Sequence, residues 1–553
     1  MRVLKNKSKE EIAIGVIAGL FVVWAIIFIL QTSNIGIDGK RYFALFDDAM
    51  ISMRYGWNLS HGHGLVWNPG EYVEGYSNFL QVLVMALATL VFDKSMAVLA
   101  MQIFGMVLIL VNAGLILKVA DYVFSDIPPQ NKAFLKVLAF ACALGYYPIL
   151  YFGLMGMETS LSTLWVLLAV LKAFEYEKTE SKAELIQASI YLGLGFLTRP
   201  DAGIFAALIY GYVFLGILGA GGKRSGYAAL GLGMAVFGLF AGGHTAFRWY
   251  YYGELVPNTY LLKMVGMPVG RRIENGWSFT DLFREQTALV FGIALIDTLF
   301  RYERKKLLLL SFFVAMLSYQ IWIGGDVWRY WRIMTPAMPF LFLLFIQGVF
   351  TPWRLFAETK FFREYFLKKP LFPWVGKLEM LVTAVVLVGF TIMNTPFRTE
   401  IIFWERPYLA TWNEKNINLA LALNRVLEED ASIGVMAAGT VPYYTDRYAI
   451  DLLGKNDKYI AGLPPDISGT ISWLGMNSVP GHNKYDLEYS IKVLKPTWLI
   501  FYRYGSQDLE AWVKENYEPM FYGPYDNGPW LLKGSDQVCW ECSSQLEQTE
   551  PAE

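Results

Sequence analysis

The chain has 553 residues, of which 55% are hydrophobic and only 17% are charged. An ordinary soluble domain carries about 25% charged residues, so this composition predicts a polytopic membrane protein. The net charge is −1 and no basic tail is present, which excludes the usual electrostatic pattern of a nucleic-acid-binding protein. Cys539 and Cys542 could form a local disulfide or stay as thiols, because two thiols cannot complete a tetrahedral zinc site.

The first apolar run, residues 12–30, is longer than the hydrophobic region of a signal peptide, and no small-x-small cleavage site follows it. We therefore expect a retained first span. Further runs of spanning or near-spanning length lie at 79–93, 95–119, 133–152, 159–174, 185–198, 202–220, 226–247, 286–300, 307–323, 337–350 and 378–394.

Lysines and arginines decide the predicted orientation, because they favour the cytoplasmic side of a membrane. They gather before the first run and in the connectors around 223–224, 301–306 and 351–377. If all twelve runs cross the membrane, the sides assigned to the loops from the N-terminus disagree with the sides assigned backwards from the run at 378–394. The run at 79–93 is the weakest, so we expect it to lie along the outer surface or to re-enter, leaving about 11 transmembrane helices.

Under this topology the polar loops meet on the extracytoplasmic face. They are the first outer loop at 31–78 and the loops at 153–158, 199–201, 248–285 and 324–332. Ionisable residues beside membrane spans are costly unless they serve a function, so this face is predicted to hold the active site.

The adjacent carboxylates Asp47 and Asp48 are the leading catalytic candidates. Group transfer to a hydroxyl needs a carboxylate that takes the proton, and two neighbouring carboxylates raise the pKa of one of them. The alternative is that the pair caps a helix that begins at Ala49.

His61 and His63 are glycine-flanked and could bind a substrate by hydrogen bonds or hold a metal ion. A metal site would need a further ligand, such as Glu71 or Glu74. A surface loop with solvent-facing histidines is the structural alternative. No cofactor is indicated, and a divalent metal ion stays open.

Cations form a third group: Arg54, Arg199, Arg248, Lys263, Arg329 and Arg332. Arginine can bind phosphate oxygens with two parallel hydrogen bonds, which suits a lipid-phosphate substrate at the membrane surface. The alternative is that these side chains extend into the phospholipid headgroup region.

From about residue 396 the hydropathy drops, and residues 396–543 are predicted to form a soluble α/β domain. A helix is expected at 413–429, buried strands at 432–438 and 496–502, a helix at 507–517 and a strand pair near 519–533. The polar tail at 544–553 is expected to be disordered.

The motifs together resemble the GT-C superfamily of glycosyltransferases, and within it the terminal arabinofuranosyltransferases of mycobacterial-type cell walls. The segments that carry the resemblance are DDAMISMRYGWNLSHGHGLVWNPGEYVEGYSN (47–78), GMET (156–159), RPD (199–201), FRWYYYGELVPNTYLLK (247–263), GGDVWRYWRIMTP (324–336), AAGTVPYYTDRYAIDLLGKNDKYIA (437–461) and PGHNKYD (480–486). Residues 327–330 depart from the family pattern, so no role is carried over to Arg329.

The resemblance implies an α-helical polytopic enzyme, with a catalytic domain at 1–395, in the inner or plasma membrane of the cell. Its active site and its C-terminal domain would be extracytoplasmic. It would move a sugar, expected to be arabinofuranose, from a polyprenyl-phosphate donor to a cell-surface glycan. Asp47 would be the catalytic carboxylate and Asp48 its support.

The remaining candidates divide into two groups. The residues expected to bind the donor phosphate are Arg54, Arg199, Lys263 and Arg332. Those expected to bind sugar or acceptor are His61, His63, Asn68, Glu71, Glu74, Glu158, His244, Asn258 and Asp326. Asp446, Arg447 and Asp451 would guide the acceptor, unless the C-terminal domain is a purely structural cap.

Two alternatives stay open. One is a transferase that moves mannose or another hexose from the same kind of lipid donor to protein or lipid. The other is a transporter of lipid-linked sugars, a class in which charged groups lie near the bilayer midplane, often at internal repeats. Outer-loop charges and the lack of a visible repeat favour the enzyme.

A reporter fused directly after Asp93 tests the predicted topology. We expect an extracytoplasmic signal, because the preceding run is not assigned as a crossing. A cytoplasmic signal at this fusion point would contradict the assignment.

Overall fold

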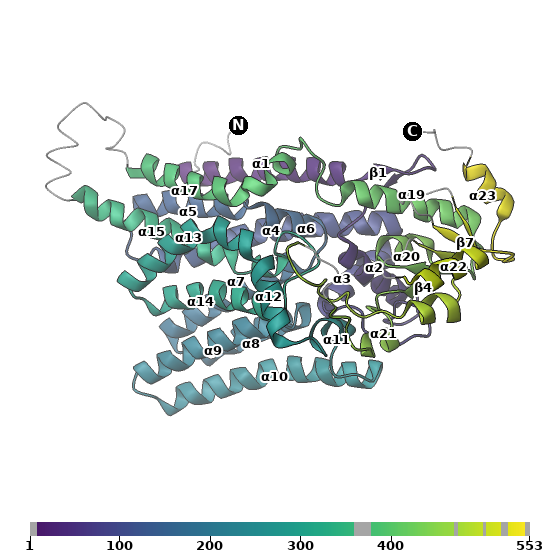
Figure 1. Ribbon diagram of the computed structural model, residues 1–553. Coiled ribbons are helices and arrows are strands. Elements are labelled where there is room, and N and C mark those ends of the chain that lie inside the picture. Colours follow the sequence, from purple (N-terminus) through teal and green to yellow (C-terminus); the bar gives the residue numbers. More distant parts are fainter. Residues whose placement is uncertain (1–7, 359–377, 469–473, 501–504, 521–528, 548–553) are drawn as a thin grey trace.

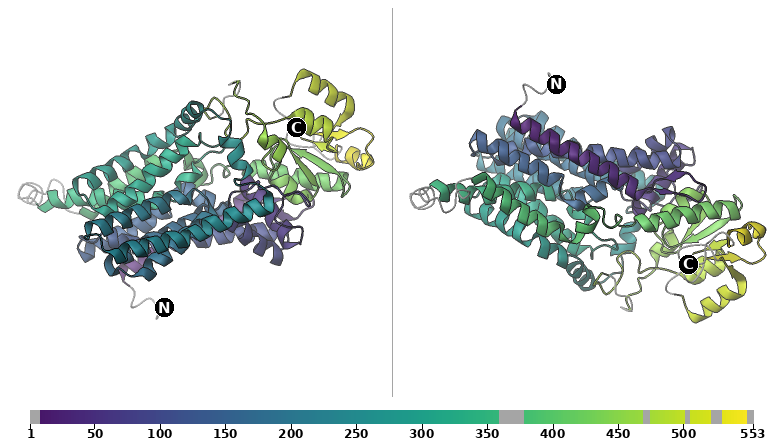
Figure 2. Two further views of the ribbon diagram at one scale, coloured as in Figure 1. Left: turned by 90° about the horizontal axis from the view of Figure 1, so that it is seen from below. Right: turned by 90° about the horizontal axis from the view of Figure 1, so that it is seen from above.

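A bundle of nearly parallel helices carries a small α/β layer at one end (Figures 1 and 2). The computed structural model describes residues 8–358, 378–468, 474–500, 505–520 and 529–547. The bundle is built from α1 (Lys9–Thr32), α4 (Lys94–Val123), α5 (Pro129–Ala143), α6 (Tyr147–Leu154), α7 (Thr159–Thr179), α8 (Lys182–Thr198), α9 (Ala202–Gly219), α10 (Arg224–Tyr252), α13 (Asp281–Phe300), α14 (Arg304–Trp322), α15 (Met338–Glu358) and α17 (Leu378–Asn394).

Among the described residues, six helices are long and apolar enough to cross a membrane, or seven if a bent pair counts as one span. Leucine, valine and aromatic side chains on several of these helices face outward, as they do where lipid takes the place of water. The predicted number of about 11 spans stays a prediction.

The apolar run at 133–152 is predicted as one segment, but it does not form one straight helix. It forms α5 and α6, which are bent by 53° at the break. Pro148 lies in the first turn of α6. Proline lacks the N–H that an interior helical position donates, so it can begin a helix but cannot continue one.

The run at 79–93 forms α3 (Phe79–Val91), a helix of 13 residues. At 1.5 Å per residue it spans about 20 Å, less than the roughly 30 Å of a bilayer core. This length agrees with its exclusion from the crossings. It packs tightly on α2 (Asp47–Ser60), where a Cβ atom at Gly56 would lie 2.9 Å from the backbone nitrogen of Ala86.

The connections at the end that carries the α/β layer contain short elements. They are β1 (Asn34–Ile35) paired antiparallel with β2 (Arg41–Tyr42), and the helices α11 (Asn258–Met264), α12 (Val269–Phe279) and α18 (Arg398–Ile401). These elements belong to the predicted outer loops and to the passage into the C-terminal region.

The C-terminal layer contains a five-stranded sheet with the order β4-β3-β5-β7-β6. Strand β3 pairs in parallel with β4 and β5, whereas β7 pairs antiparallel with β5 and β6. The bounds are β3 (Ser432–Val435), β4 (Tyr448–Asp451), β5 (Trp498–Leu499), β6 (Tyr517–Pro519) and β7 (Trp530–Leu532), with helices α19 (Ala410–Val426), α20 (Thr440–Thr445), α21 (Lys458–Gly462), α22 (Gln507–Asn516) and α23 (Trp540–Glu547). The predicted α/β character is confirmed.

The end of the chain differs from the expectation. Residues 544–547 continue helix α23 instead of forming part of a disordered tail, and residues 548–553 lie outside the described part. Cys539 and Cys542, at the start of this helix, are joined by a disulfide. This cross-link holds together the turn from which α23 begins.

Arg54 joins α2 to the α/β layer. Its side chain donates to the carbonyl oxygens of Trp67 at 2.6 Å, Pro442 at 2.5 Å and Arg447 at 2.9 Å, and to Oδ1 of Asn68 at 2.9 Å. The residue is only 4% exposed, and burial lowers the pKa of its guanidinium to about 10, so it stays charged at pH 7. Arg54 therefore has a structural position, in contrast to its predicted contact with the donor phosphate.

Replacing Arg54 with alanine should destabilise the protein by about 3 kcal/mol, because it leaves buried carbonyl groups without donors. Arg425→Ala is the matched control, since Arg425 is exposed and makes one long bond of 3.5 Å to the carbonyl oxygen of Ile37. Thermal unfolding of the purified variants measures both. Equal melting temperatures for the two variants would contradict this role.

Candidate active site

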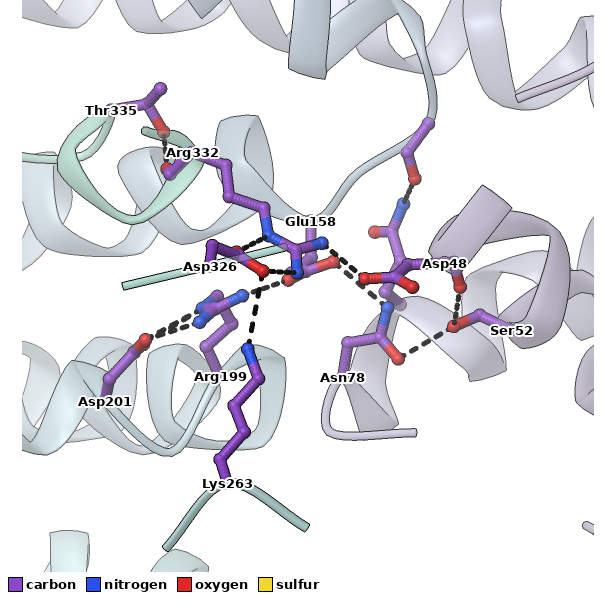
Figure 3. Close-up of polar contacts among 12 residues, drawn as sticks. Asp48, Ser52, Asn78, Glu158, Arg199, Asp201, Lys263, Asp326, Arg332 and Thr335 are labelled. Atoms are coloured by element: carbon purple, nitrogen blue, oxygen red, sulfur yellow. Dashed lines mark hydrogen bonds and ion pairs between the residues drawn. The ribbon is translucent and has the colours of Figure 1, made fainter. Parts of the chain in front are cut away.

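The predicted outer loops meet around a cavity of about 290 Å³ at the end of the bundle that faces the α/β layer. We call it the first cavity. Its charged lining residues are Asp48, Glu158, Arg199, Asp201, Arg248, Lys263, Asp326, Arg332 and Lys455, and His482 joins them. The prediction that separate polar loops meet at one site is therefore confirmed. Figure 3 shows the central contacts.

Asp48 is held between two cations. Its Oδ2 accepts a bond of 2.7 Å from Arg332, and its Oδ1 accepts one of 2.6 Å from Lys455. Burial alone would raise the pKa of Asp48, but the charges of Lys455 and Arg332 outweigh it and hold this pKa well below its usual value. Asp48 is therefore ionised across the physiological pH range.

Arg332 is fixed by a second carboxylate. Its Nε donates to Oδ2 of Asp326 at 2.8 Å, and Lys263 lies 3.4 Å from Oδ1 of the same group. Tyr330 and Trp331 directly precede Arg332, and their φ angles of 76° and 51° lie in the left-handed region. Such angles are unfavourable for bulky residues and persist where the surrounding structure imposes them. The loop thus aims the guanidinium at Asp48.

A second ion cluster lies beside the first (Figure 3). Arg199 donates to Glu158 at 2.5 Å and to Asp201 at 2.6 Å. Glu158 also accepts from Asn78 at 3.1 Å, and Ser52 on α2 donates to Asn78 at 3.0 Å. This chain of bonds connects Arg199 to the helix that carries the aspartates.

The charges of the first cavity suit an anion. Five cations line it, namely Arg199, Arg248, Lys263, Arg332 and Lys455, against the four carboxylates of Asp48, Glu158, Asp201 and Asp326. Glu74, which does not line the cavity, pairs with Arg248 and balances the fifth cation. The carboxylates orient the cations in advance. Preorganised guanidinium groups bind phosphate without a further entropic cost for their ordering.

Asp47 points to a different space. Together with Asp48 it lines a second cavity of about 450 Å³, which adjoins the α/β layer. Asp47 is 3% exposed and accepts a bond of 3.2 Å from the backbone N–H of Thr440. Burial, and then the charge of Asp48, raise its pKa to about 7, although the Thr440 N–H opposes this shift. A carboxyl with this pKa can accept and release a proton near neutrality.

The two cavities share a wall. Asp48, Val327, Lys455 and His482 line both of them. His482 is neutral at pH 7, because burial and the charge of Lys455 lower its pKa to about 4. The ion pair of Asp48 and Lys455 is therefore the charged part of the boundary.

His61 and His63 lie elsewhere. Both are exposed at the C-terminal end of α2, roughly 20 Å along the helix axis from Asp48 at 1.5 Å per residue, and His61 stacks on Trp57. In the described structure they line neither cavity. Their expected contact with the sugar or acceptor is not supported by this position, because the glycine-flanked loop lies in solvent.

Three other predicted residues, Asn68, Glu71 and Glu74, contact other protein groups and line neither cavity in the described structure. Asn68 donates to Glu71 and to the carbonyl of Ala449, and Glu71 also accepts from Tyr448. Glu74 is paired with Arg248, which lines the first cavity. These positions are structural, in contrast to their expected contacts with the substrate.

Two more predicted residues are buried outside the cavities. Asn258 donates to the carbonyl oxygens of Gly454 and Asp457 and thereby ties α11 to the α/β layer. His244 lies on α10 between the rings of Phe79 and Phe196. Of the predicted sugar and acceptor ligands, Glu158 and Asp326 do line the first cavity.

Four residues that line the first cavity are not among the site residues predicted from the sequence: Lys455, His482, Asp201 and Asn78. Lys455 and His482 lie within the segments 437–461 and 480–486, which carried the resemblance. Their proximity to Asp48 arises from the packing of distant parts of the chain. Within the described residues, no group of three or more His, Cys, Asp or Glu side chains could hold a metal ion.

Comparison of sequences matches part of this chain to known proteins, and comparison of structures matches most of it. A family model described as "Domain of unknown function (DUF8728)" matches residues 407–540. A terminal β-(1→2)-arabinofuranosyltransferase of Corynebacterium glutamicum is 27% identical over 300 residues. That match covers 50% of this chain and 39% of the relative.

Solved structures match over most of the chain. ArnT from Cupriavidus metallidurans bound to undecaprenyl phosphate has a TM-score of 0.56 at 12% identity, with 93% of this chain and 97% of ArnT covered. The oligosaccharyltransferase of Archaeoglobus fulgidus has a TM-score of 0.54 at 11% identity, with 90% and 70% covered.

The protein is thus a polytopic membrane protein with the GT-C fold of these glycosyltransferases. Within this class, the terminal arabinofuranosyltransferase of Corynebacterium glutamicum is a relative in sequence. The predicted superfamily resemblance is confirmed at the level of the fold.

Proposed function

We propose that this protein is a membrane glycosyltransferase that moves a sugar from a polyprenyl-phosphate donor to a glycan acceptor on the extracytoplasmic face of the membrane. The observation that carries the proposal is the first cavity, where oriented cations surround an ionised aspartate at the junction of five polar loops. The match to ArnT bound to undecaprenyl phosphate supports a lipid-phosphate donor.

In the proposed reaction, Arg199, Lys263 and Arg332 bind the donor phosphate. The acceptor hydroxyl oxygen forms a bond to the anomeric carbon, and the bond from this carbon to the phosphate oxygen breaks. The hydroxyl proton goes to Asp47. The leaving polyprenyl phosphate takes the electron pair of the broken bond, and the cations stabilise the additional negative charge that it gains. Asp48 keeps Arg332 and Lys455 in place at the boundary where the bond forms.

We propose arabinofuranose as the sugar, because the curated sequence relative is an arabinofuranosyltransferase. A hexose such as mannose is the alternative within the enzymes. A transporter of lipid-linked sugars is less consistent with the charges, which gather at one end of the bundle instead of near its middle. Sugar transfer by the purified protein from polyprenyl-phosphate donors, with and without divalent metal, tests these alternatives. Donor binding without any transfer would favour the transporter.

Asp47→Asn should reduce sugar transfer at least about 100-fold, because the amide cannot accept the proton. Expression and thermal stability should be retained. Wild-type rates in this variant would end the assignment of Asp47.

The rate of sugar transfer by the wild type should rise with pH, as expected when a general base must be ionised. Only the ionised form of Asp47 accepts a proton, and its pKa is raised to about 7. The rate should therefore fall as the pH decreases below about 7, and level off above it. A flat profile between pH 5 and 9, measured with saturating donor, would contradict this role.

Gly439 tests the position of Asp47 without altering its chemistry. A Cβ atom at residue 439 would clash with the carbonyl and carboxyl oxygens of Asp47. Gly439→Ala should reduce transfer about tenfold or more, since small displacements of reacting groups are costly. The control is Gly462→Ala, because residue 462 has no atom within 4 Å of the added methyl group. Equal rates in both variants would show that this contact does not position the carboxylate.

A further inference from the structure

The second cavity lies at the edge of the sheet where parallel strands end. Met436 and Ala437 follow β3, Asp451 is the last residue of β4, and Ile500 follows β5. These three strands run parallel to one another. In open α/β sheets, ligands bind in the crevice outside the carboxyl ends of the strands. The edge of the α/β layer that suits a ligand therefore faces the two aspartates.

Three aromatic residues contribute to the lining of this cavity. They are Trp328, Tyr408 and Trp412, and each is half-buried. Trp412 comes from α19, whereas Trp328 comes from the loop that also carries Asp326. Aromatic walls with a few polar groups are typical of sites for small organic ligands, and ring faces pack well on the C–H faces of sugars.

The charges distinguish the second cavity from the first. Three carboxyl groups (Asp47, Asp48 and Asp451) and one lysine (Lys455) line it, whereas cations outnumber carboxylates in the first cavity. An anionic lipid headgroup is therefore disfavoured in the second cavity. A neutral ligand rich in hydroxyl groups fits its aromatic wall and its carboxylate acceptors.

We infer that the second cavity is the acceptor subsite, and that it holds the terminal sugar of a neutral glycan between Trp412 and the carboxyl edge of the sheet. This inference rests on the proposed function. A sugar held there places a hydroxyl group against Asp47, beside the boundary with the first cavity. The α/β layer then forms one wall of the acceptor site instead of serving only as a cap.

Asp451 has a supporting place in this subsite. Its carboxylate accepts from the backbone N–H groups of Leu453 at 3.1 Å and Asn456 at 2.8 Å, and from the Asn456 side chain at 3.0 Å. These bonds hold the turn that leads from β4 to Lys455. Asp446 and Arg447 do not line the cavity in the described structure, because Asp446 pairs with Lys94 and Arg447 donates to the carbonyls of Thr445 and Leu427.

Trp412→Ala tests the inference, with Trp404→Ala as the control. Trp404 is 82% exposed and lies outside both cavities. The purified proteins are titrated with a neutral arabinofuranosyl oligosaccharide and, separately, with undecaprenyl phosphate. Trp412→Ala should weaken oligosaccharide binding at least about tenfold, as expected for an aromatic anchor, and should leave undecaprenyl phosphate binding within about twofold. Trp404→Ala should change neither affinity.

Lys263→Gln is the reciprocal variant, which should weaken binding of undecaprenyl phosphate and spare the oligosaccharide, because Lys263 lines only the first cavity. Trp412→Phe should restore much of the oligosaccharide affinity, which separates loss of the ring from loss of folding. Unchanged oligosaccharide binding in Trp412→Ala, or no oligosaccharide binding by the wild type, would overturn the inference. If the wild type binds the oligosaccharide but not undecaprenyl phosphate, the proposed donor fails while the acceptor subsite stands.

Discussion

The site depends on one ion-pair arrangement, in which Asp48 lies between Arg332 and Lys455. Arg332 comes from the loop after α14, Lys455 comes from the segment after β4, and Asp48 lies in the first turn of α2. The three charges therefore connect the first outer loop, the helix bundle and the α/β layer at one point. Removing one partner from such a buried cluster leaves an uncompensated charge, so the three elements are coupled energetically.

This arrangement also separates the behaviour of two adjacent aspartates. Asp48 faces two cations and stays ionised, whereas Asp47 is buried beside the charge of Asp48 and has its pKa raised to about 7. Adjacent positions on a helix point in different directions, so Asp47 lines only the second cavity, whereas Asp48 lines both. The pair thus places a permanent negative charge and a titratable group at the boundary between two cavities.

Much of the fold and part of the site could be predicted from the sequence. Long apolar runs predict helices reliably, and the strands and helices of the C-terminal region follow from their periodicity. Asp47, Asp48, Arg199, Lys263 and Arg332 could be selected because charge beside membrane spans is costly. Arg54, His61 and His63 are also ionisable and lie in the same outer loop as the two aspartates. Packing, however, places Arg54 against backbone carbonyls and leaves the histidines exposed. Lys455 and His482 could not be assigned, because only the docking of the α/β layer brings them to Asp48.

The central claim is that the first cavity holds the phosphate of a polyprenyl-phosphate donor. The most direct test is an experimental structure of the protein in lipid nanodiscs with undecaprenyl phosphate. We expect phosphate density within hydrogen-bond distance of Arg332 and of Lys263 or Arg199, next to Asp48. Phosphate density in the second cavity, or at the opposite end of the bundle, would contradict it.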